Sequence, residues 1–344
     1  MPYHICSPHA ARWDAFVRAH PDGHALQLSA WGAHQSRFGW QPLRVAITDE
    51  SGALAAGAQV LVRWLPLGMG KRAYAPAAPL FSADEAANAL LWQALRRCGA
   101  AFVKFEPCNW YRPRPDLPER LLRAGLRHSP ETVQVVRTLI VDLRGSEEDI
   151  LKRMNQSTRY KCRLGAKKAV AVRQGDAQDA LRFGALMQVT AQRDGFYARP
   201  PEYYQSAYQA FAPSGEVALL IASHAGQDLA GAMIFRCGEN AYYLYGASSD
   251  VERNRMPTYI LQWEAMRWAK AQGALRYDLW GIPDADLETL EAEFERRDDG
   301  LWRVYKFKRG FGGEVRRSVG AWDLVNNRLI YAVYQWYVRQ RSKR

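Results

Sequence analysis

The chain has 344 residues, a length that favours about two domains. Hydrophobic residues make up 48% and charged residues 24%, which is ordinary globular usage and excludes a disordered or fibrous protein. The net charge of +12 favours an anionic partner: nucleic acid, a phosphorylated substrate or an anionic membrane face. No apolar run approaches the roughly 18 residues of a membrane span, and the N-terminus does not resemble a signal peptide. We therefore expect a cytoplasmic protein.

Cysteines and histidines give no sign of a metal or redox centre. The five cysteines are scattered without a CxxC pair, and six of the seven histidines fall in the first 128 residues without metal-ligand spacing. We expect reduced thiols, no metal, no cofactor and no histidine-centred triad.

The two halves of the sequence resemble each other. Each half shows the order strand, turn, strand, helix, strand, and the matching segments keep an offset of 171 to 174 residues. The matches are Ala56-Gly57-Ala58 with Ala230-Gly231-Ala232, Tyr74 with Tyr245, and Trp92-Gln-Ala-Leu-Arg96 with Trp263-Glu-Ala-Met-Arg267. The repeat predicts an α/β (α+β) chain of two tandem acetyltransferase-like domains with mixed sheets.

The domain boundary is expected where a strand at 137–141 gives way to a helix that begins near Ser146. We expect the second domain to span 146–314 and to close near Gly312 and Gly313. The first domain would then comprise 1–145 together with 315–344, and it would end in a helix from about Asn326.

Charge is concentrated in three segments. Residues 151–175 hold eight cations and no acid, 303–344 hold eleven cations against two acids, and 284–299 hold eight acids. A solvated face is the plain interpretation of any one run, whereas two basic segments together favour salt-dependent binding of a polyanion.

The last helix carries an apolar stripe that we expect to dock on the first domain. Its members are Leu329, Ile330, Val333, Trp336 and Tyr337. The basic tail that follows (Arg339, Arg341, Lys343 and Arg344) is a candidate for peripheral contact with the anionic inner membrane face.

An acyl-CoA donor fits neither half. Such donors need a glycine-rich turn before a helix, but residues 253–258 contain no glycine and Pro257 removes one N–H donor. Residues 76–80 in the first half are no better.

Three further features could carry chemistry, although each also suits packing or a surface role. Alternation at 305–309 predicts a strand with Lys306 and Lys308 on one face and Phe307 on the other. Arg199 and Tyr203 stand four apart at a helix start marked by Pro200 and Pro201. Tyr243 and Tyr245 are expected to share one strand face.

Together these features resemble the Fem-type (FemABX) peptidyltransferases, across nearly the whole chain. The resemblance is carried by Leu26-Gln-Leu-Ser-Ala-Trp-Gly32, Phe38-Gly-Trp40, Gln134 with Thr138 and Asp142-Leu143, Thr158-Arg-Tyr-Lys161 with Arg163, Arg193-Asp-Gly-Phe196, Tyr243-Leu-Tyr-Gly-Ala-Ser248, Arg255-Met-Pro257, Tyr277-Asp-Leu-Trp-Gly281, and Phe307-Lys308 with Gly310-Phe-Gly-Gly313. It implies the branch without a coiled-coil arm, which uses aminoacyl-tRNA to add amino acids to peptidoglycan precursors. The first domain would grip the muropeptide and the second the aminoacyl-tRNA.

The resemblance also implies roles for individual residues. Lys308, with Phe307 beside it, would carry the chemistry, because a cation can stabilise the oxyanion that forms as an ester becomes an amide. Arg199 and Tyr203 would grip the precursor phosphates, and Tyr245 and Tyr243 match its tyrosine contact. The remaining candidates are Gln35, where the family often has a phosphate-binding lysine, Arg37 as its substitute, and Glu106 as a carboxylate near the attacking amine.

Five cations of the basic segment are candidates for the acceptor-stem phosphates: Arg159, Lys161, Arg163, Lys167 and Lys168. We expect a tRNA-dependent aminoacyltransferase that acts on a UDP-linked or lipid-linked muropeptide. The alternatives are an acetyltransferase-like N-acyltransferase with another donor, acting on polysaccharide or lipid, and a nonenzymatic RNA- or membrane-binding protein.

Overall fold

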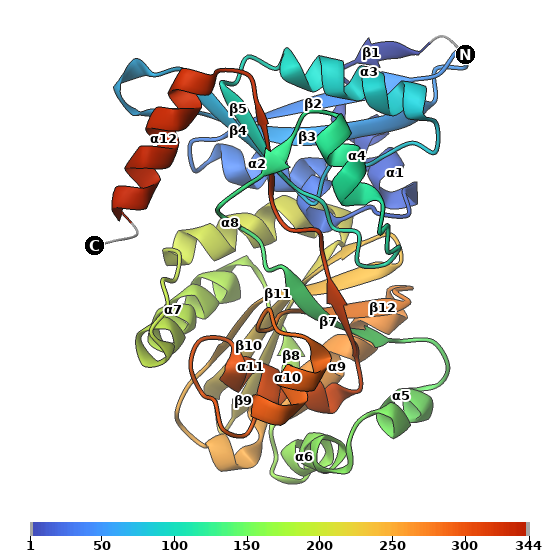
Figure 1. Ribbon diagram of the computed structural model, residues 1–344. Coiled ribbons are helices and arrows are strands. Elements are labelled where there is room, and N and C mark those ends of the chain that lie inside the picture. Colours follow the sequence, from blue (N-terminus) through green and yellow to red (C-terminus); the bar gives the residue numbers. More distant parts are fainter. Residues whose placement is uncertain (1–2, 342–344) are drawn as a thin grey trace. The chain divides into compact units, whose positions relative to one another are not determined.

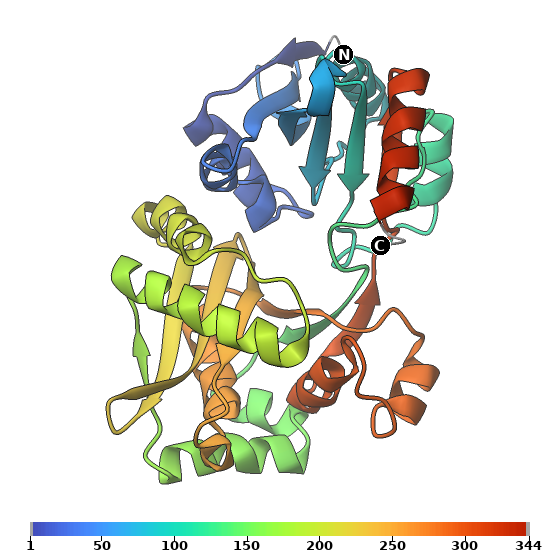
Figure 2. The same ribbon diagram turned by 90° about the vertical axis from the view of Figure 1, so that its left-hand side faces the viewer.

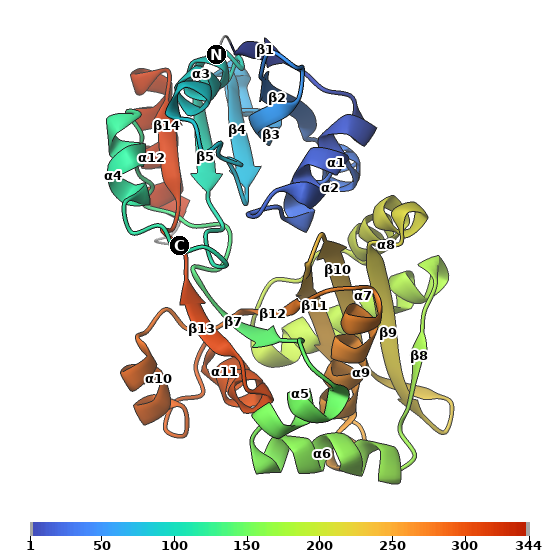
Figure 3. The same ribbon diagram turned by 90° about the vertical axis from the view of Figure 1, so that its right-hand side faces the viewer.

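A computed structural model describes residues 3–341 of the chain, which form two compact units (Figure 1). One unit runs to Val136 and resumes at Ser318, and the other comprises Arg137–Arg317. The expected boundaries at 145/146 and 314/315 are therefore displaced to 136/137 and 317/318. The strands on either side of the second unit explain the shift, because β7 (Arg137–Asp142) and β13 (Glu314–Arg317) pair with each other in its sheet (Figure 3).

The first unit is built on a seven-stranded mixed sheet in the order β1-β2-β3-β4-β5-β14-β6. Only β4 and β5 among these neighbours run parallel. The strands are β1 (His4–Cys6), β2 (Gln41–Thr48), β3 (Leu54–Trp64), β4 (Lys71–Pro76), β5 (Phe102–Glu106), β6 (Arg127–His128) and β14 (Trp322–Val325).

Some helices of the first unit contribute to two separate clusters of buried side chains. The helices are α1 (Ala10–Ala19), α2 (Ser29–Ser36), α3 (Glu85–Arg96), α4 (Leu117–Arg123) and α12 (Arg328–Arg341). α3 and α4 share the main core of the unit, to which they contribute Leu91 and Leu121. α12 joins a smaller cluster around Phe102.

The second unit repeats this plan. Its sheet has the order β13-β7-β12-β11-β10-β9-β8, and β11 and β12 form its parallel pair. The remaining strands are β8 (Ala171–Gln174), β9 (Val217–His224), β10 (Gln227–Cys237), β11 (Asn240–Ser248) and β12 (Arg276–Gly281). Tyr74 in β4 and Tyr245 in β11 each precede a helix and a parallel strand, so the internal repeat predicted from the sequence is confirmed.

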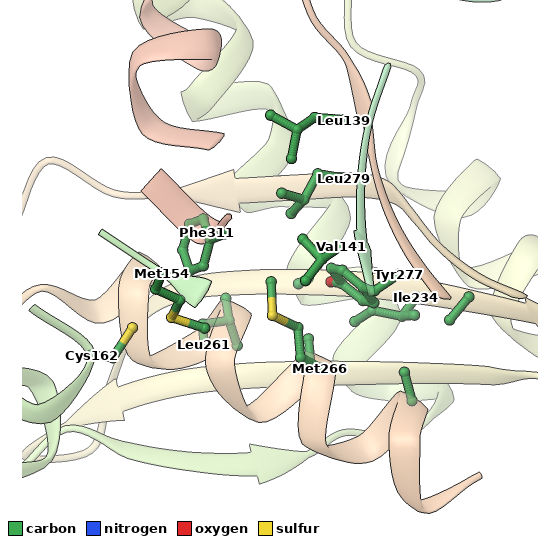
Figure 4. Close-up of a cluster of buried hydrophobic side chains, with 14 of the residues drawn as sticks. Leu139, Val141, Met154, Cys162, Ile234, Leu261, Met266, Tyr277, Leu279 and Phe311 are labelled. Atoms are coloured by element: carbon green, nitrogen blue, oxygen red, sulfur yellow. The ribbon is translucent and has the colours of Figure 1, made fainter. Parts of the chain in front are cut away.

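Helices cover both faces of the second sheet. They are α5 (Glu147–Arg153), α6 (Gln156–Lys167), α7 (Ala177–Asp194), α8 (Pro201–Phe211), α9 (Pro257–Ala271), α10 (Leu287–Glu293) and α11 (Trp302–Lys308). α9 brings Leu261 and Met266 into a core with Ile234 and Tyr277 (Figure 4). α7 lies across the opposite face of the sheet (Figure 2). On that face the Phe183 ring fits against Gly231.

The sequence located some helix ends well. α5 begins with a capping box in which Ser146 and Asp149 exchange hydrogen bonds, as expected for the helix near Ser146.

The acidic segment forms the short helix α10 and a turn, and no coiled-coil arm occurs in the described part of the chain. None of the helices within residues 3–341 is both long enough and apolar enough to cross a membrane.

The last helix docks on the first unit as expected, but of the predicted stripe only Ile330 joins the contact, and the assignment of the other four residues to it is wrong. α12 packs on the first unit through Ile330, Tyr331 and Tyr334. Leu329 is 80% exposed and Trp336 is 63% exposed. The expected stripe lies beside the buried one on the helix surface, because neighbouring helical residues are separated by about 100°.

Candidate functional site

Lys308 is placed by the helix α11, not by a strand. Trp302, Tyr305 and Lys308 follow a spacing of three and are the buried residues of this helix. Lys306 is exposed, so the expectation that it shares a face with Lys308 is wrong. A Lys-Phe-Lys alternation is too short to separate a strand from a helix, whereas the three-residue spacing was the informative signal.

The Lys308 ammonium group is enclosed by protein. The residue is only 5% exposed, and its Nζ donates a hydrogen bond to the Gly281 carbonyl at 2.8 Å. The same Nζ lies 5.8 Å from the centroid of the Tyr243 ring. Burial lowers the pKa of Lys308 to about 7, although the nearby negative charge of Asp278 acts to raise it. At neutral pH the group therefore exists in both its charged and its neutral forms.

Asp278 shapes the turn that faces Lys308. Its Oδ1 accepts hydrogen bonds from the Trp280 N–H at 2.7 Å and from the Thr138 hydroxyl. Trp280 has a φ of +63°, a conformation that costs a non-glycine residue about 1 kcal/mol or more. The following residue, Gly281, supplies the carbonyl that Lys308 contacts. Sequence reasoning assigned no role to Asp278, although the segment 277–281 was part of the resemblance.

A bulge in β11 separates the two tyrosines that were expected to share a face. Met233 of β10 pairs with Tyr245, but the next residue, Ile234, pairs with Tyr243, so Leu244 is an extra residue. Tyr243 consequently packs with the α9 core, whereas Tyr245 lies on the other face of the sheet. The expectation of one face is wrong because strand alternation fails at a bulge.

Tyr243 belongs to the surroundings of Lys308. Burial raises the pKa of its phenol to about 12, so the hydroxyl remains a hydrogen-bond donor at neutral pH. A Cβ at Gly246 would lie 1.6 Å from that hydroxyl, so only glycine fits there.

Arg199, Tyr203 and Tyr245 form a second cluster, which also includes Tyr204. The Tyr245 ring centroid lies 6.4 Å from that of Tyr203 and 5.2 Å from that of Tyr204. The exposed Arg199 guanidinium lies 5.4 Å from the centroid of the Tyr203 ring. Within residues 3–341 no carboxylate pairs with Arg199, so the cluster offers a cation and phenols to an anion.

The five candidate cations of the basic segment differ in their contacts with the rest of the protein. Arg159 donates to the carbonyls of Leu151 and Met154 at the end of α5, and Lys168 donates to the Asn254 carbonyl at 2.8 Å. Lys161 lies 4.8 Å from the centroid of the Tyr259 ring, which in turn packs on Phe307 at 5.0 Å.

Arg163 and Lys167 remain exposed on α6. With Arg159 and the exposed Tyr160 they line a groove of about 310 Å³. A groove lined by cations and an aromatic ring suits a nucleic-acid strand.

The candidates in the first unit have different environments. Gln35 is buried on α2, whereas Arg37 is exposed at its end. Glu106 is buried and accepts hydrogen bonds from the Tyr74 hydroxyl at 2.5 Å and from the Gln134 N–H at 3.0 Å. Burial raises the pKa of the Glu106 carboxyl. Within the described residues no three His, Cys, Asp or Glu side chains form a metal-binding group.

Comparison with known proteins identifies the family. The model of the FemAB family matches residues 9–225 and 214–339. This chain belongs to the FemAB family. It is therefore an aminoacyltransferase, an enzyme that forms amide bonds by acyl transfer, as the sequence predicted.

Individual relatives and structures agree with this family. A lipid II:glycine glycyltransferase of Staphylococcus haemolyticus is 26% identical, over 94% of this chain and 93% of that protein. Its counterpart in Staphylococcus aureus strain USA300 is 25% identical over the same shares. The crystal structure of FemX has a TM-score of 0.85 at 23% identity and covers 96% of this chain and 99% of its own. A tandem GNAT protein from clavulanic acid biosynthesis covers 94% of this chain and 99% of its own, with a TM-score of 0.56 at 10% identity, which confirms the tandem acetyltransferase-like fold.

Proposed function

We propose that this FemAB protein transfers an aminoacyl group from aminoacyl-tRNA to an amine of the stem peptide of a peptidoglycan precursor. The amine attacks the ester carbon, the new C–N bond forms, the tRNA hydroxyl leaves with a proton, and the amine loses one. The staphylococcal relatives carry the name lipid II:glycine glycyltransferase, which supports a lipid-linked muropeptide as the acceptor. A UDP-linked muropeptide is the alternative acceptor, and we place the reaction at the cytoplasmic membrane face.

The observation that carries the proposal is the enclosed Lys308. An aminoacyl ester is already activated, so the amine needs alignment and the developing oxyanion needs a donor. The Lys308 ammonium supplies that donor from a position where water cannot screen it, since the side chain is buried. Loss of such a donor typically costs about 3 kcal/mol, on the order of a hundredfold in rate. Phe307 packs on Tyr259 and Phe311 and so anchors the helix that presents the lysine.

Substrate contacts follow from the remaining clusters. Arg199, Tyr203 and Tyr245 would hold the precursor phosphates, and Tyr243 would contact the substrate beside Lys308. Arg163 and Lys167, on the exposed face of α6, would hold acceptor-stem phosphates. In the first unit, which we assign to the muropeptide, Arg37 would replace the absent lysine at Gln35, and Glu106 would accept a proton from the attacking amine.

The assay incubates the purified chain with mixed charged tRNAs and a UDP-linked or lipid-linked muropeptide, followed by mass measurement of the product. We expect a mass gain of one or more aminoacyl groups that disappears when the tRNA is first digested with ribonuclease. A gain that survives digestion would favour the N-acyltransferase with another donor. The family assignment argues against the nonenzymatic alternative.

Lys308 has a matched control on its own helix. The variant Lys308→Met should lose about a hundredfold in turnover. Lys306→Met removes an exposed lysine two residues away and should remain near wild type. Wild-type turnover by a folded Lys308→Met variant would overturn the catalytic role.

A further inference from the structure

The exposed side of α12 carries apolar side chains that no part of the described chain covers. Leu329, Val333 and Trp336 follow the spacing i, i+4, i+7, and all three are exposed. Trp336 alone exposes 63% of its surface. Scattered apolar residues on a protein surface are ordinary, but a contiguous helical stripe of this kind marks an interaction surface.

A cationic pocket adjoins the stripe. It has a volume of about 520 Å³, and Arg127, Arg328 and Arg339 line it together with Trp336. Within residues 3–340 none of these arginines forms an ion pair with a carboxylate, although Arg127 lies 5.5 Å from the centroid of the Tyr331 ring. Three guanidinium groups around one hollow leave a positive potential that fits a phosphate.

The helix can offer this side because its other side is fixed. Tyr331 and Tyr334 pack against Phe102 with ring centroids 5.3 and 4.8 Å apart, and Ile330 joins the same cluster. The Tyr331 hydroxyl also donates to Asp323 at 2.8 Å. Figure 2 shows α12 (red) held along the first sheet. The exposed stripe is therefore presented in one orientation.

We propose that this side of α12 docks on an anionic phospholipid bilayer. Leu329, Val333 and Trp336 would enter the boundary between headgroups and acyl chains, and the arginine pocket would receive a lipid phosphate. Charge favours a lipid surface over a second copy of this chain, because a symmetric dimer built on this face would bring the arginines of one copy against those of the other. A Trp at the level of the headgroups flanked by cations is the usual composition of an interfacial helix. The proposal goes beyond the proposed function, since docking needs no turnover.

The experiment is co-sedimentation of the full chain with vesicles of phosphatidylcholine alone or mixed with phosphatidylglycerol. We expect binding to the anionic vesicles that weakens with salt. The double variant Val333→Ser, Trp336→Ser should bind at least tenfold more weakly. Arg328→Gln with Arg339→Gln should also weaken binding, roughly 25-fold at about fivefold per cation. Leu122→Ser and the pair Arg97→Gln with Arg123→Gln remove exposed groups elsewhere on the first unit and should bind like wild type.

A conservative variant guards against misfolding. Vesicles that contain brominated lipid should quench part of the tryptophan fluorescence of the wild-type chain. Trp336→Phe should still bind vesicles, but the quenching that Trp336 contributes should be lost. Equal binding by all variants, or no wild-type binding, would overturn the proposal. A wild-type dimer that the Val333→Ser, Trp336→Ser variant dissociates would assign the stripe to a second copy. Loss of tRNA binding in the arginine variant without loss of vesicle binding would assign the pocket to RNA. Aminoacyl transfer to a soluble acceptor is measured separately, so failure of docking leaves the proposed function standing.

Discussion

The Trp280 N–H donates a 2.7 Å hydrogen bond to the Asp278 carboxylate, and this contact closes the turn that leads into Gly281. Gly281 then presents its carbonyl to the Lys308 Nζ. One buried carboxylate therefore acts on Lys308 in two ways. It holds the backbone that the ammonium contacts, and its charge favours the ammonium form.

Removal of that charge should move the pH dependence of the enzyme. Asp278→Asn keeps an oxygen acceptor for the Trp280 N–H but loses the charge that raises the pKa of Lys308. We expect turnover at pH 7.5 to fall by roughly tenfold, for a shift of about one pH unit, with KM unchanged. The measurement is turnover against pH for the variant and for Asp298→Asn, an exposed control. A variant with a wild-type pH profile would show that Asp278 is purely structural.

The charge state of Lys308 predicts how the rate of transfer changes with pH on the alkaline side. Burial lowers its pKa to about 7, and the ammonium is the form that stabilises an oxyanion. Single-turnover rates should therefore fall as pH rises above about 7. Lys308→Arg stays cationic at every accessible pH, so its residual activity should lack this fall. A falling limb that is identical in both proteins would assign the ionisation to another group.

Arg199 should affect acceptor binding more than chemistry. Its guanidinium lies over the Tyr203 ring and is open to solvent. Arg199→Gln removes one charge-assisted contact to a phosphate, and the loss should raise the KM for the muropeptide by roughly tenfold or more at unchanged kcat. The exposed control Arg296→Gln should leave both constants unchanged. A loss confined to kcat would remove Arg199 from the phosphate site.

The exposed face of α6 should set the salt dependence of tRNA binding. The double variant Arg163→Gln, Lys167→Gln should weaken binding and lower the slope of log K against log salt by about 1.4 to 1.8. Lys168→Gln serves as the control, because its Nζ is committed to the Asn254 carbonyl. Binding measured from 50 to 300 mM salt with an unchanged slope would place the tRNA elsewhere.

Much of the architecture was readable from the sequence. The internal repeat predicted two sheets of the same plan, because its matches, such as Tyr74 with Tyr245, fall on corresponding strands. The domain boundary was misplaced, because the helix cap at Ser146 is a local signal. Membership of β7 in the second sheet depends on pairing with β12, and β13 then adds to β7, although both partners lie more than 130 residues away in the chain.

The site was predictable in its residues but not in its geometry. Lys308 was identified by resemblance, yet its helix and its burial depend on tertiary packing. The opposite faces of Tyr243 and Tyr245 depend on one bulge that no local pattern signals. The two stripes of α12 are both apolar, so the sequence could not decide which one the first sheet would cover.

Leu244 accounts for an asymmetry within the duplicated plan. In the first unit, β4 runs against β3 from Leu61–Tyr74 to Trp64–Lys71 without any slip in register. In the second unit, the corresponding strand β11 contains the extra residue Leu244. Because of this bulge, the side chains of Tyr243 and Tyr245 lie on opposite faces of the sheet. A deletion of Leu244 would make β11 regular but would leave Tyr243 paired with Ile234 and Tyr245 paired with Met233, so the two phenols would still lie on opposite faces. The bulge thus lets two tyrosines that stand two residues apart in the chain serve opposite faces of the second sheet, with Tyr243 on the face that holds Lys308.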